Sequence, residues 1–517
     1  MNETHTTGAF DADVAIIGYG PSGVVAANTL GLHGVSTIAF ERDREIHPRA
    51  RAVTVNDWTM RIFQALGLDG VLKKDMDAMR ALRWITYDGA ELLGVGFPPS
   101  SLGGGTRFYS IYQPVMESSL RAGAERFPEH VSVRYGAEVV GVAHDATGVT
   151  VTARDEAGTE SSVRVRYVLA CDGGSSPTRA MIGARLEGGT IDTTWLVVDC
   201  RVRRWWPDRN LLTFWCDAER PVVDIALALG NHRWELPLRP EESPADFPTS
   251  AEVWPLLRDM GITEDDVEIH QHAFYRHHSR MADRWRAGRV FLVGDAAHLM
   301  APWAGSGMQS GMRDAYDISW KLARVLRGDL PESFLNTYEA ERRPNVAMFI
   351  EMSEELGRIV RLELGEAEMA ALTAAPPEGE PAPEPPLIQP PVLAGGWLRG
   401  PVGDGVVGRM LPQPSAADPR GRIARLDDLL GDGFVLLGDE IDPRDLLSAE
   451  ERAGWDALDA RYLTVRPVDK GTETDAEIVD VDGVLCGWMR GFGVRAVAVR
   501  PDRFVAACDA HGLAVPA

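Results

Sequence analysis

Cysteine is scarce in this 517-residue chain, and its five copies are too scattered to form a pair of known type. They are Cys171, Cys200, Cys216, Cys486 and Cys508. No CxxC and no zinc-ligand spacing occurs among them, and a chain of this size with few cysteines is typical of a reduced compartment. We therefore expect a cytoplasmic protein without structural zinc or a disulfide framework.

Long apolar runs and an excess of basic residues are also missing. Nowhere do about 18 apolar residues follow one another, which is the length that a membrane span needs. The start, MNETHTTGAFDADV, has no basic stretch followed by an apolar one, so we expect no signal peptide. The formal net charge is −23, from 53 Lys and Arg against 76 Asp and Glu. Such a charge disfavours nucleic acid and anionic membranes as partners.

The histidines offer no clear metal site. Four of them gather in the stretch HQHAFYRHHSR, at His270, His272, His277 and His278. Two of these share a strand face and two are adjacent, so none has the chelating spacing of a helical pair. We expect surface or supporting roles for them and no metal ion.

The first chemical motif lies near the N-terminus. An apolar strand, Asp13–Ile17, runs into Gly18-Tyr19-Gly20-Pro21-Ser22-Gly23, and a second strand over 36–40 ends at Glu41. Glycines in this GxGxxG pattern allow a tight turn and close approach of a pyrophosphate to a helix N-terminus, while the acidic residue bonds a ribose diol. The pattern predicts a dinucleotide site, without choosing between NAD and FAD. Its residues are Gly18, Gly20, Pro21, Ser22, Gly23, Glu41 and Arg42.

A second motif, VFLVGDAAHLMAPWAGSGMQSGMRDA, covers residues 290–315. An apolar strand ends at Gly294-Asp295, and a rigid Pro302-Trp303 and a glycine cluster precede a predicted helix. A nicotinamide dehydrogenase needs no such segment, whereas FAD is long enough to need a second anchor. Asp295 can bond ribityl hydroxyls, and the helix N-terminus can stabilise charge on a reduced flavin. An Asp that caps the helix is the alternative for this segment alone; both motifs together predict one FAD site.

These motifs resemble those of the class A flavoprotein aromatic hydroxylases, most closely the hydroxyphenylpropionate hydroxylases. The family carries an N-terminal GxGxxG, a middle DG and a later GD; here the middle mark is Cys171-Asp172-Gly173. Arg51-Ala52-Val53 and Gln113-Pro114 match further flavin-contacting positions. One departure stands out: the family's Gly-Gln-Gly loop is Gly305-Ser306-Gly307 here, followed by Met308-Gln309.

The resemblance implies an FAD-dependent monooxygenase that uses NAD(P)H and O2 to hydroxylate a phenolic substrate, for example one of the hydroxyphenylpropionate type, through a flavin C4a-hydroperoxide. It implies catalytic roles for Pro302, Trp303 and Arg51, with Arg51 and Asp172 linked to flavin movement. The other cofactor contacts it implies are Gln113, Gly294, Asp295, Gly305, Ser306, Gly307, Met308 and Gln309. A tailoring enzyme for a polycyclic aromatic natural product, a flavin reductase and a flavin-binding regulator without turnover remain alternatives.

The domain organisation follows from the same resemblance and from the strand patterns. We expect an α/β chain with a glutathione-reductase-type, Rossmann-like FAD domain, an antiparallel substrate sheet and a thioredoxin-like C-terminal domain, in a monomer or homodimer. The expected bounds are 11–183 with 284–375, then 184–283, a proline-rich linker at 376–394, and 395–517. The pocket candidates are Trp195, Phe214, Cys216, Trp234 and Trp303.

Two local expectations concern helices. Apolar residues recur at helical spacing over 52–66, which predicts one helix across that whole range. Ser448 and Glu451 have the spacing of a capping box, which predicts a helix start.

Overall fold

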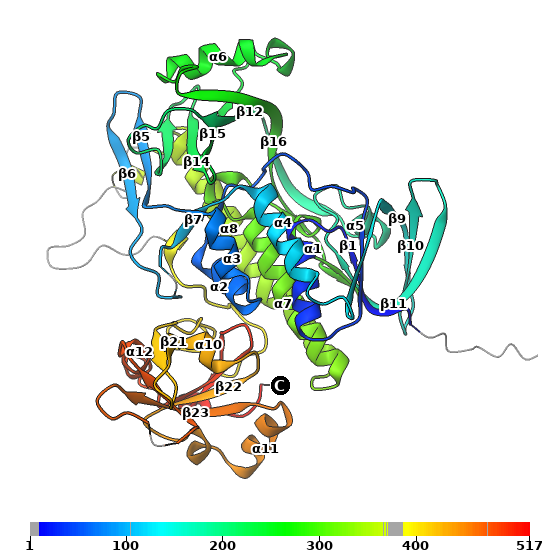
Figure 1. The fold of residues 1–517 in the computed structure, drawn as a ribbon, viewed down its shortest axis with the longest axis vertical. Helices are drawn as coiled ribbons and strands as arrows, with labels where there is room; N and C mark the ends of the chain where they lie inside the picture. Colours follow the sequence, from blue (N-terminus) through cyan, green and yellow to red (C-terminus); the bar gives the residue numbers. More distant parts are fainter. Residues whose placement is uncertain are drawn as a thin grey trace, which may run out of the picture.

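The computed structural model describes residues 10–516 apart from positions 104, 366, 369, 371–385 and 473. The described chain forms a mixed α/β fold with four sheets, of eight, eight, seven and three strands. Figure 1 shows the second large sheet beneath α6 and the third in a lower body built from the C-terminal residues. Residues 376–385 of the predicted linker lie outside the described residues. Within the described part, no helix combines the length and the apolar character that crossing a membrane requires.

The first sheet is parallel at its centre. Its path is β17-β18-β11-β1-β2-β8, and β10 and β9 extend it antiparallel from β11. The bounds are β1 (Ala12–Ile17), β2 (Thr37–Glu41), β8 (Val131–Tyr135), β9 (Ala137–His144), β10 (Val149–Asp155), β11 (Glu160–Ala170), β17 (Arg286–Ala287) and β18 (Val290–Leu292). Because β1, β11 and β18 run parallel, their carboxyl ends meet at one edge, where an α/β sheet binds its ligands.

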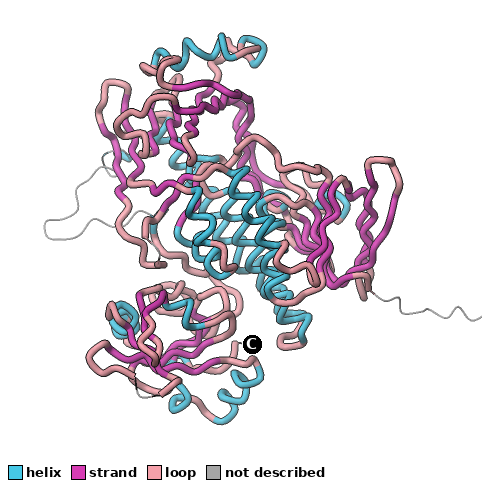
Figure 2. The backbone as a smooth tube through the Cα atoms, in the orientation of Figure 1, coloured by secondary structure: helices cyan, strands magenta, loops and turns pink. Residues whose placement is uncertain are grey.

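Four helices dominate the packing around this sheet. They are α1 (Pro21–Leu32), α4 (Gln113–Ala124), α7 (Gly307–Arg327) and α8 (Thr337–Val360). The short α3 (Asp69–Leu72) lies next to α4, and α5 (Pro177–Met181) lies next to β9. Figure 2 shows helices gathered at the centre of the molecule, between strands on two sides. α1 is buried along nearly its whole length, which explains its run of small and aliphatic side chains. The two motifs of the sequence therefore start the two helices that lie against each other, α1 and α7.

The single helix predicted over 52–66 is wrong at its start. Residues Thr54–Asn56 form β3, which pairs with β7 (Phe108–Ser110) in a small sheet completed by β4 (Asp77–Ala78). α2 then covers Asp57–Ala65, and the Asn56 side chain caps it by accepting a hydrogen bond from Thr59 N. Val55 is buried in β3, as it would also be in a helix. The spacing of apolar residues therefore could not distinguish the two structures here, and it placed the start of the helix too early.

The second sheet is the Trp-rich one. Its order is β19-β16-β12-β15-β14-β13-β5-β6, antiparallel except for the parallel pair of β13 and β5. The bounds are β5 (Ala81–Thr86), β6 (Glu91–Gly96), β12 (Leu186–Val202), β13 (Leu212–Cys216), β14 (Val222–Leu227), β15 (Asn231–Pro237), β16 (Val267–Ala282) and β19 (His298–Leu299). α6 (Ser250–Asp259) packs on one face. Three strands, β5, β6 and β19, come from outside the range 184–283 that was expected to supply the sheet.

The C-terminal residues build the third large sheet, ordered β21-β20-β24-β23-β22-β25-β26. The bounds are β20 (Ser415–Ala417), β21 (Ile423–Arg425), β22 (Val435–Asp439), β23 (Arg461–Pro467), β24 (Glu477–Asp480), β25 (Ala496–Val499) and β26 (Val505–Cys508), with α10 (Leu426–Leu430), α11 (Ala449–Ala457) and α12 (Val484–Gly491). The predicted capping box is confirmed, since Ser448 and Glu451 cap α11 reciprocally.

A buried ionic cluster joins this C-terminal body to the rest of the chain. Arg500, fully buried, donates to both oxygens of Glu341 on α8 at 2.8 and 2.7 Å. Lys321 of α7 donates to the same carboxylate at 2.6 Å. Burial alone would raise the pKa of Glu341, but Arg500 and Lys321 outweigh it and hold this pKa at about 2. The carboxylate is therefore charged and fully paired at neutral pH.

Removing the charge of Glu341 should destabilise the protein strongly. Glu341→Gln removes the charge-assisted hydrogen bonds that Arg500 and Lys321 donate, although Asp502 still pairs with Arg500 at 2.6 Å and Asp317 with Lys321 at 2.9 Å. The free energy of unfolding should therefore fall by about 1.5–3 kcal/mol. Urea denaturation measures this. The exposed pair Arg44–Glu156 is the control, and Glu156→Gln should leave the unfolding midpoint unchanged. Equal effects of the two substitutions would contradict a stabilising role for the cluster.

Candidate active site

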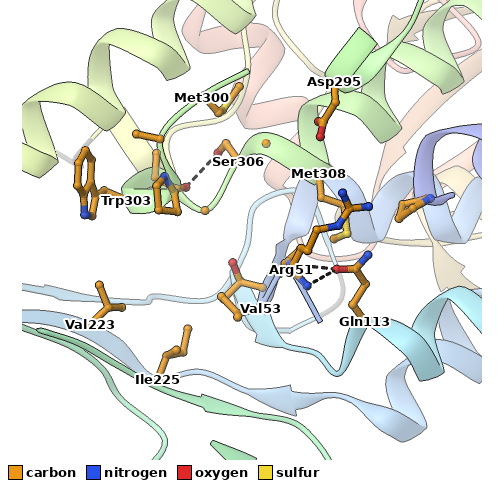
Figure 3. A pocket seen from close by; sticks show the side chains of 18 of the residues that line it. Arg51, Val53, Gln113, Val223, Ile225, Asp295, Met300, Trp303, Ser306 and Met308 are labelled. Atoms are coloured by element: carbon orange, nitrogen blue, oxygen red, sulfur yellow. Dashed lines mark hydrogen bonds between the residues drawn. The ribbon is translucent and has the colours of Figure 1, made fainter. Parts of the chain in front are cut away.

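A cavity of about 310 Å³ lies where the first sheet, the loop before α7 and the second sheet meet. Its lining comes from segments far apart in the sequence. From the first sheet and its helices come Gly20, Pro21, Ser22, Gln113, Cys171, Gly173 and Asp295; from the loop, Met300 to Met308; and from the second sheet, Leu82, Leu212, Phe214, Val223, Ile225 and Glu235. Figure 3 shows that side chains of these groups converge on one space.

The glycine turn after β1 leaves a helix N-terminus open to the cavity. A Cβ on Gly18 would lie 2.5 Å from the Cys171 carbonyl oxygen, and a Cβ on Gly23 would lie 2.0 Å from that of Gly18. A Cβ on Gly20, in contrast, would meet nothing within 4 Å. Gly20 precedes α1, whose first turn has neither a capping side chain nor an acidic residue. The free N–H groups of this turn suit a phosphate.

Glu41 lies at the carboxyl end of β2, next to that turn. Its Oε2 accepts from Tyr19 N at 2.7 Å and its Oε1 from Asp43 N at 3.0 Å. The carboxylate is thus fixed beside the glycine turn, where a ribose diol would lie if a dinucleotide bound there. The side chain of the next residue, Arg42, is exposed, and its Nε lies 3.5 Å from Asp43 Oδ2.

The loop of the second motif brings another open helix N-terminus to the same cavity. Gly294 and Asp295 form a 3-10 turn after β18, and the Asp295 side chain points toward the space near Met308 (Figure 3). Pro302 and Trp303 form the next turn, and Gly305 has a positive φ of 58°. Ser306 precedes α7, but its hydroxyl donates to Ala304 O at 3.0 Å and does not cap the helix. The N–H groups of α7 are left for a ligand.

Gln113 fixes the backbone of the Arg51 segment. Its Oε1 accepts from both Arg51 N and Ala52 N at 2.8 Å. Figure 3 shows these two bonds to Gln113, with the Arg51 side chain extending beside Met308. The segment is therefore held by its main chain, and its exposed guanidinium lines the cavity.

Two predicted cofactor residues direct their side chains elsewhere. Asp172 accepts from Ser176 Oγ at 2.5 Å and Thr178 N at 3.0 Å, at the start of α5. Gln309 is fully buried, and its Oε1 accepts from Asn56 N at 2.7 Å at the junction of β3 and α2. Any contact of Gln309 with a cofactor would have to come from its main chain.

The predicted pocket residues divide between the two faces of the second sheet. Phe214 and Trp303 line the cavity, and Trp195 packs behind Trp303 with ring centroids 5.9 Å apart. Cys216 is buried in the same apolar cluster. Trp234 lies in the cluster on the opposite face, against α6. Strand alternation separates these groups.

The same alternation turns Glu235, which was not among the predicted pocket residues, toward the cavity. Tyr275 donates to Glu235 Oε2 at 2.6 Å. Arg233 faces the same side, pairs with Asp199 at 2.7 Å and donates to the carbonyl oxygens of Ala50 and Arg51. Burial raises the pKa of Glu235 above its usual value, although Arg233 and Tyr275 oppose the rise. Strand alternation was the available signal. Trp234 and Glu235 are neighbours on one strand, so if Trp234 packs on the outer face of the sheet, Glu235 must face the cavity.

Trp303 is held from two sides. A Cβ on Gly357 of α8 would lie 2.5 Å from the Trp303 ring, so this helix position must lack a side chain. The His277 ring meets Trp303 edge-on at 5.1 Å and stacks on Trp195 at 5.0 Å. Burial, and next Arg361, lower the pKa of His277 to about 3. His277 is therefore neutral and packs as part of an aromatic wall.

Comparisons with known proteins agree with this geometry. A family model described as an FAD binding domain matches residues 11–353, and one described as the HcaD C-terminal domain matches 408–515. The chain belongs to this FAD-binding family. A 3-(3-hydroxy-phenyl)propionate/3-hydroxycinnamic acid hydroxylase of Burkholderia cenocepacia is 36% identical, across 97% of this chain and 94% of the relative. One of Mycobacterium sp. (strain JLS) is 34% identical, across 97% and 90%.

Solved structures agree on the fold. Aklavinone-11 hydroxylase, in complex with FAD and aklavinone, has a TM-score of 0.78 at 22% identity, covering 97% of this chain and 96% of that one. The flavin-dependent monooxygenase PieE has a TM-score of 0.79 at 23% identity, covering 96% of each chain. The chain is an FAD-dependent aromatic hydroxylase, and the open space at Gly20 and the uncapped helices fit FAD.

Adding one methyl group at Gly357 should disturb the wall of the cavity. Gly357→Ala forces the Trp303 ring or α8 to move, at a cost of about 1–3 kcal/mol. Urea denaturation and the KM of the aromatic substrate check this, and both should worsen. Gly487 of α12 is the matched helical control, since a Cβ there would meet nothing within 4 Å. Gly487→Ala should be neutral or stabilising, and a similar loss there would contradict the packing argument.

His277 should make the protein sensitive to acid. Its folded pKa of about 3 lies below the ordinary value, so the unfolded chain binds a proton that the folded chain refuses. Stability present at neutral pH is then lost as the pH falls below about 6.5, by up to about 1.4 kcal/mol per unit. Urea denaturation between about pH 7 and about pH 5 should show a shallower decline for His277→Phe than for the wild type. The exposed His47→Gln should follow the wild type; identical slopes for all three would refute the assignment.

Proposed function

We propose that this chain hydroxylates the ring of a phenolic substrate, consuming NAD(P)H and O2. The observation that carries the proposal is a single cavity with two chemically different ends. Two uncapped helix N-termini open on one end, and apolar side chains of the second sheet line the other. When bound, FAD would accept a hydride from NAD(P)H and activate O2 for transfer of one oxygen atom. The resemblance to hydroxyphenylpropionate hydroxylases supports the phenolic class.

In this proposal, different residues of the chain hold the two ends of FAD and orient the substrate. The turn from Gly18 to Gly23 and the fixed Glu41 would hold the adenosine and diphosphate end. Asp295 and the main chain from Gly305 to Met308 would hold the flavin end. Pro302 and Trp303 line the same cavity, where they would exclude water and orient the aromatic ring. We also assign Arg51 to this site, because its guanidinium lines the cavity.

A second candidate is hydroxylation of a polycyclic phenol. The apolar lining favours it: Leu82, Leu212, Phe214, Val223 and Ile225 form a broad apolar surface on the sheet side. A fused ring system would bury more apolar area on this surface than a single ring would. The reacting ring and the flavin chemistry are the same in both candidates.

We further propose that the C-terminal body is thioredoxin-like but has no redox role. Its order β23-β22-β25-β26, with β22 parallel to β23 and antiparallel to β25, supports that fold. Thiol exchange needs an accessible thiolate, whereas Cys486 and Cys508 are buried, and burial raises the pKa of Cys486 to about 12. The body packs against α8 through Arg500.

The proposed function is tested by NAD(P)H oxidation with a panel of phenylpropionates, cinnamates, benzoates and polycyclic phenols. At least one phenol should raise the oxidation rate and yield a product with one added oxygen atom on its ring, identified by mass spectrometry. Gly20→Val is the matched variant: a Cβ there meets no protein atom within 4 Å, so the variant should fold yet lose FAD absorbance and activity. The proposal fails if no phenol stimulates oxidation, or if only hydrogen peroxide forms.

A further inference from the structure

Glu235 stands out among the cavity-lining side chains. The charged residues of the described lining are Arg51, Asp295 and Glu235. Arg51 and Asp295 lie at the proposed flavin end, whereas Glu235 lies on the second sheet among Leu212, Phe214, Val223 and Ile225. A carboxyl group in an apolar lining costs free energy unless it has a partner. Any oxygen of Glu235 that the protein leaves without a hydrogen bond therefore favours a polar group on the molecule that fills the cavity.

The two oxygens of Glu235 have different surroundings. Oε2 is fixed by Tyr275, at 2.6 Å from the hydroxyl. Oε1 lies 3.6 Å from Arg233 Nη1, beyond the roughly 3.2 Å limit of a good hydrogen bond. Arg233 is committed to Asp199 and to the main chain of Ala50 and Arg51. Oε1 thus keeps its capacity to accept a hydrogen bond.

We propose that Glu235 Oε1 binds the ring hydroxyl of the substrate and takes its proton during hydroxylation, an inference that rests on the proposed function. The phenol O–H bond breaks, its electron pair stays on oxygen, and the ring becomes electron-rich where the new C–O bond forms. The O–O bond derived from O2 breaks in the same step, and its other oxygen leaves as water with the two electrons that NAD(P)H supplies. The hydrogen of the attacked carbon then leaves as a proton, and Glu235 returns its own proton to the first oxygen. Overall, phenol, O2, NAD(P)H and a proton give a dihydroxylated ring, NAD(P)⁺ and water.

The surroundings of Glu235 favour this role. It is faced by Arg233 on its own strand, by Tyr275 on β16 and by Asp199 on β12. Burial raises its pKa, which makes the carboxylate a stronger base toward a phenol than an exposed Glu. Arg233 limits the rise, so the carboxylate form remains accessible.

The assignment also restricts the substrate. A carboxylate beside Glu235 would place two negative charges in an apolar site, and Arg233 already pairs with Asp199. The end of the substrate that meets the second sheet is therefore an uncharged hydroxylated ring. An acidic side chain, where the substrate has one, must point away from Glu235.

The test compares the holoenzyme with Glu235→Gln, using the most active phenol of the panel. A second probe is a ring-fluorinated analogue that is already ionised at the assay pH and keeps its reacting position free. With the ordinary phenol, kcat should fall about 10²-fold or more. With the ionised analogue the loss should be clearly smaller, because no proton has to be removed. Equal losses with both phenols overturn the proposal, since a merely structural role would not depend on substrate ionisation.

Tyr275→Phe provides a second measurement that does not need Glu235→Gln to fold. The Tyr275 hydrogen bond lowers the pKa of Glu235, so its removal should move the ascending limb of the kcat profile to higher pH. Leu236→Val is the matched control, because this neighbour on β15 lies on the opposite face. Its pH profile should equal that of the wild type, and an unmoved limb in Tyr275→Phe counts against the proposal. A wild-type chain that no phenol stimulates refutes the proposed function instead.

Discussion

Two helix N-termini without capping side chains face one cavity, and much of the surrounding structure keeps them there. Their unpaired N–H groups need an external partner, and the positive ends of the helix dipoles favour an anionic one. The close approach depends on glycines: a Cβ on Gly294 would lie 2.7 Å from Ser22 Oγ, and one on Gly311 would lie 3.0 Å from the Gly294 Cα. α1 and α7 can therefore lie side by side only because these positions lack side chains. FAD carries a diphosphate, an anion of the kind that these N–H groups and helix dipoles bind.

The two strand–turn–helix segments and the FAD cofactor were predictable from sequence because the signals are local. The turn at Gly18 follows a strand and starts a helix within a few residues, and the Asp295 loop repeats that pattern at another strand end. Parallel strands bring such ends together without further information. The family match agrees with the FAD domain that these two patterns predicted. Their combination carried more information than either motif alone.

The side of the cavity that the second sheet lines could not be predicted in the same way. Which side chains of β15 face the cavity depends on pairing with β12 and β14, and a shift of one residue exchanges the two faces. Trp234 was expected in the pocket and lies against α6, while Glu235 lines the cavity. The parallel pair of β5 and β13 joins residues more than 100 positions apart, which no local pattern reveals. The same difficulty arises on a helix: the direction in which the Gln309 side chain points depends on the residue at which α7 begins, and the sequence did not fix that residue.

The polar network around Glu235 links the two ends of the cavity through one short segment. Arg233 donates to the carbonyl oxygens of Ala50 and Arg51, while Gln113 accepts from the N–H groups of Arg51 and Ala52. The main chain is thereby held from opposite sides by the second sheet and by α4. A proton gained or lost by Glu235 changes the field at Arg233, 3.6 Å away, and so the strength of its bonds to that segment. The charge of the cavity-facing carboxyl of Glu235 and the position of the Arg51 main chain are therefore physically coupled, because the Arg233 guanidinium lies near both.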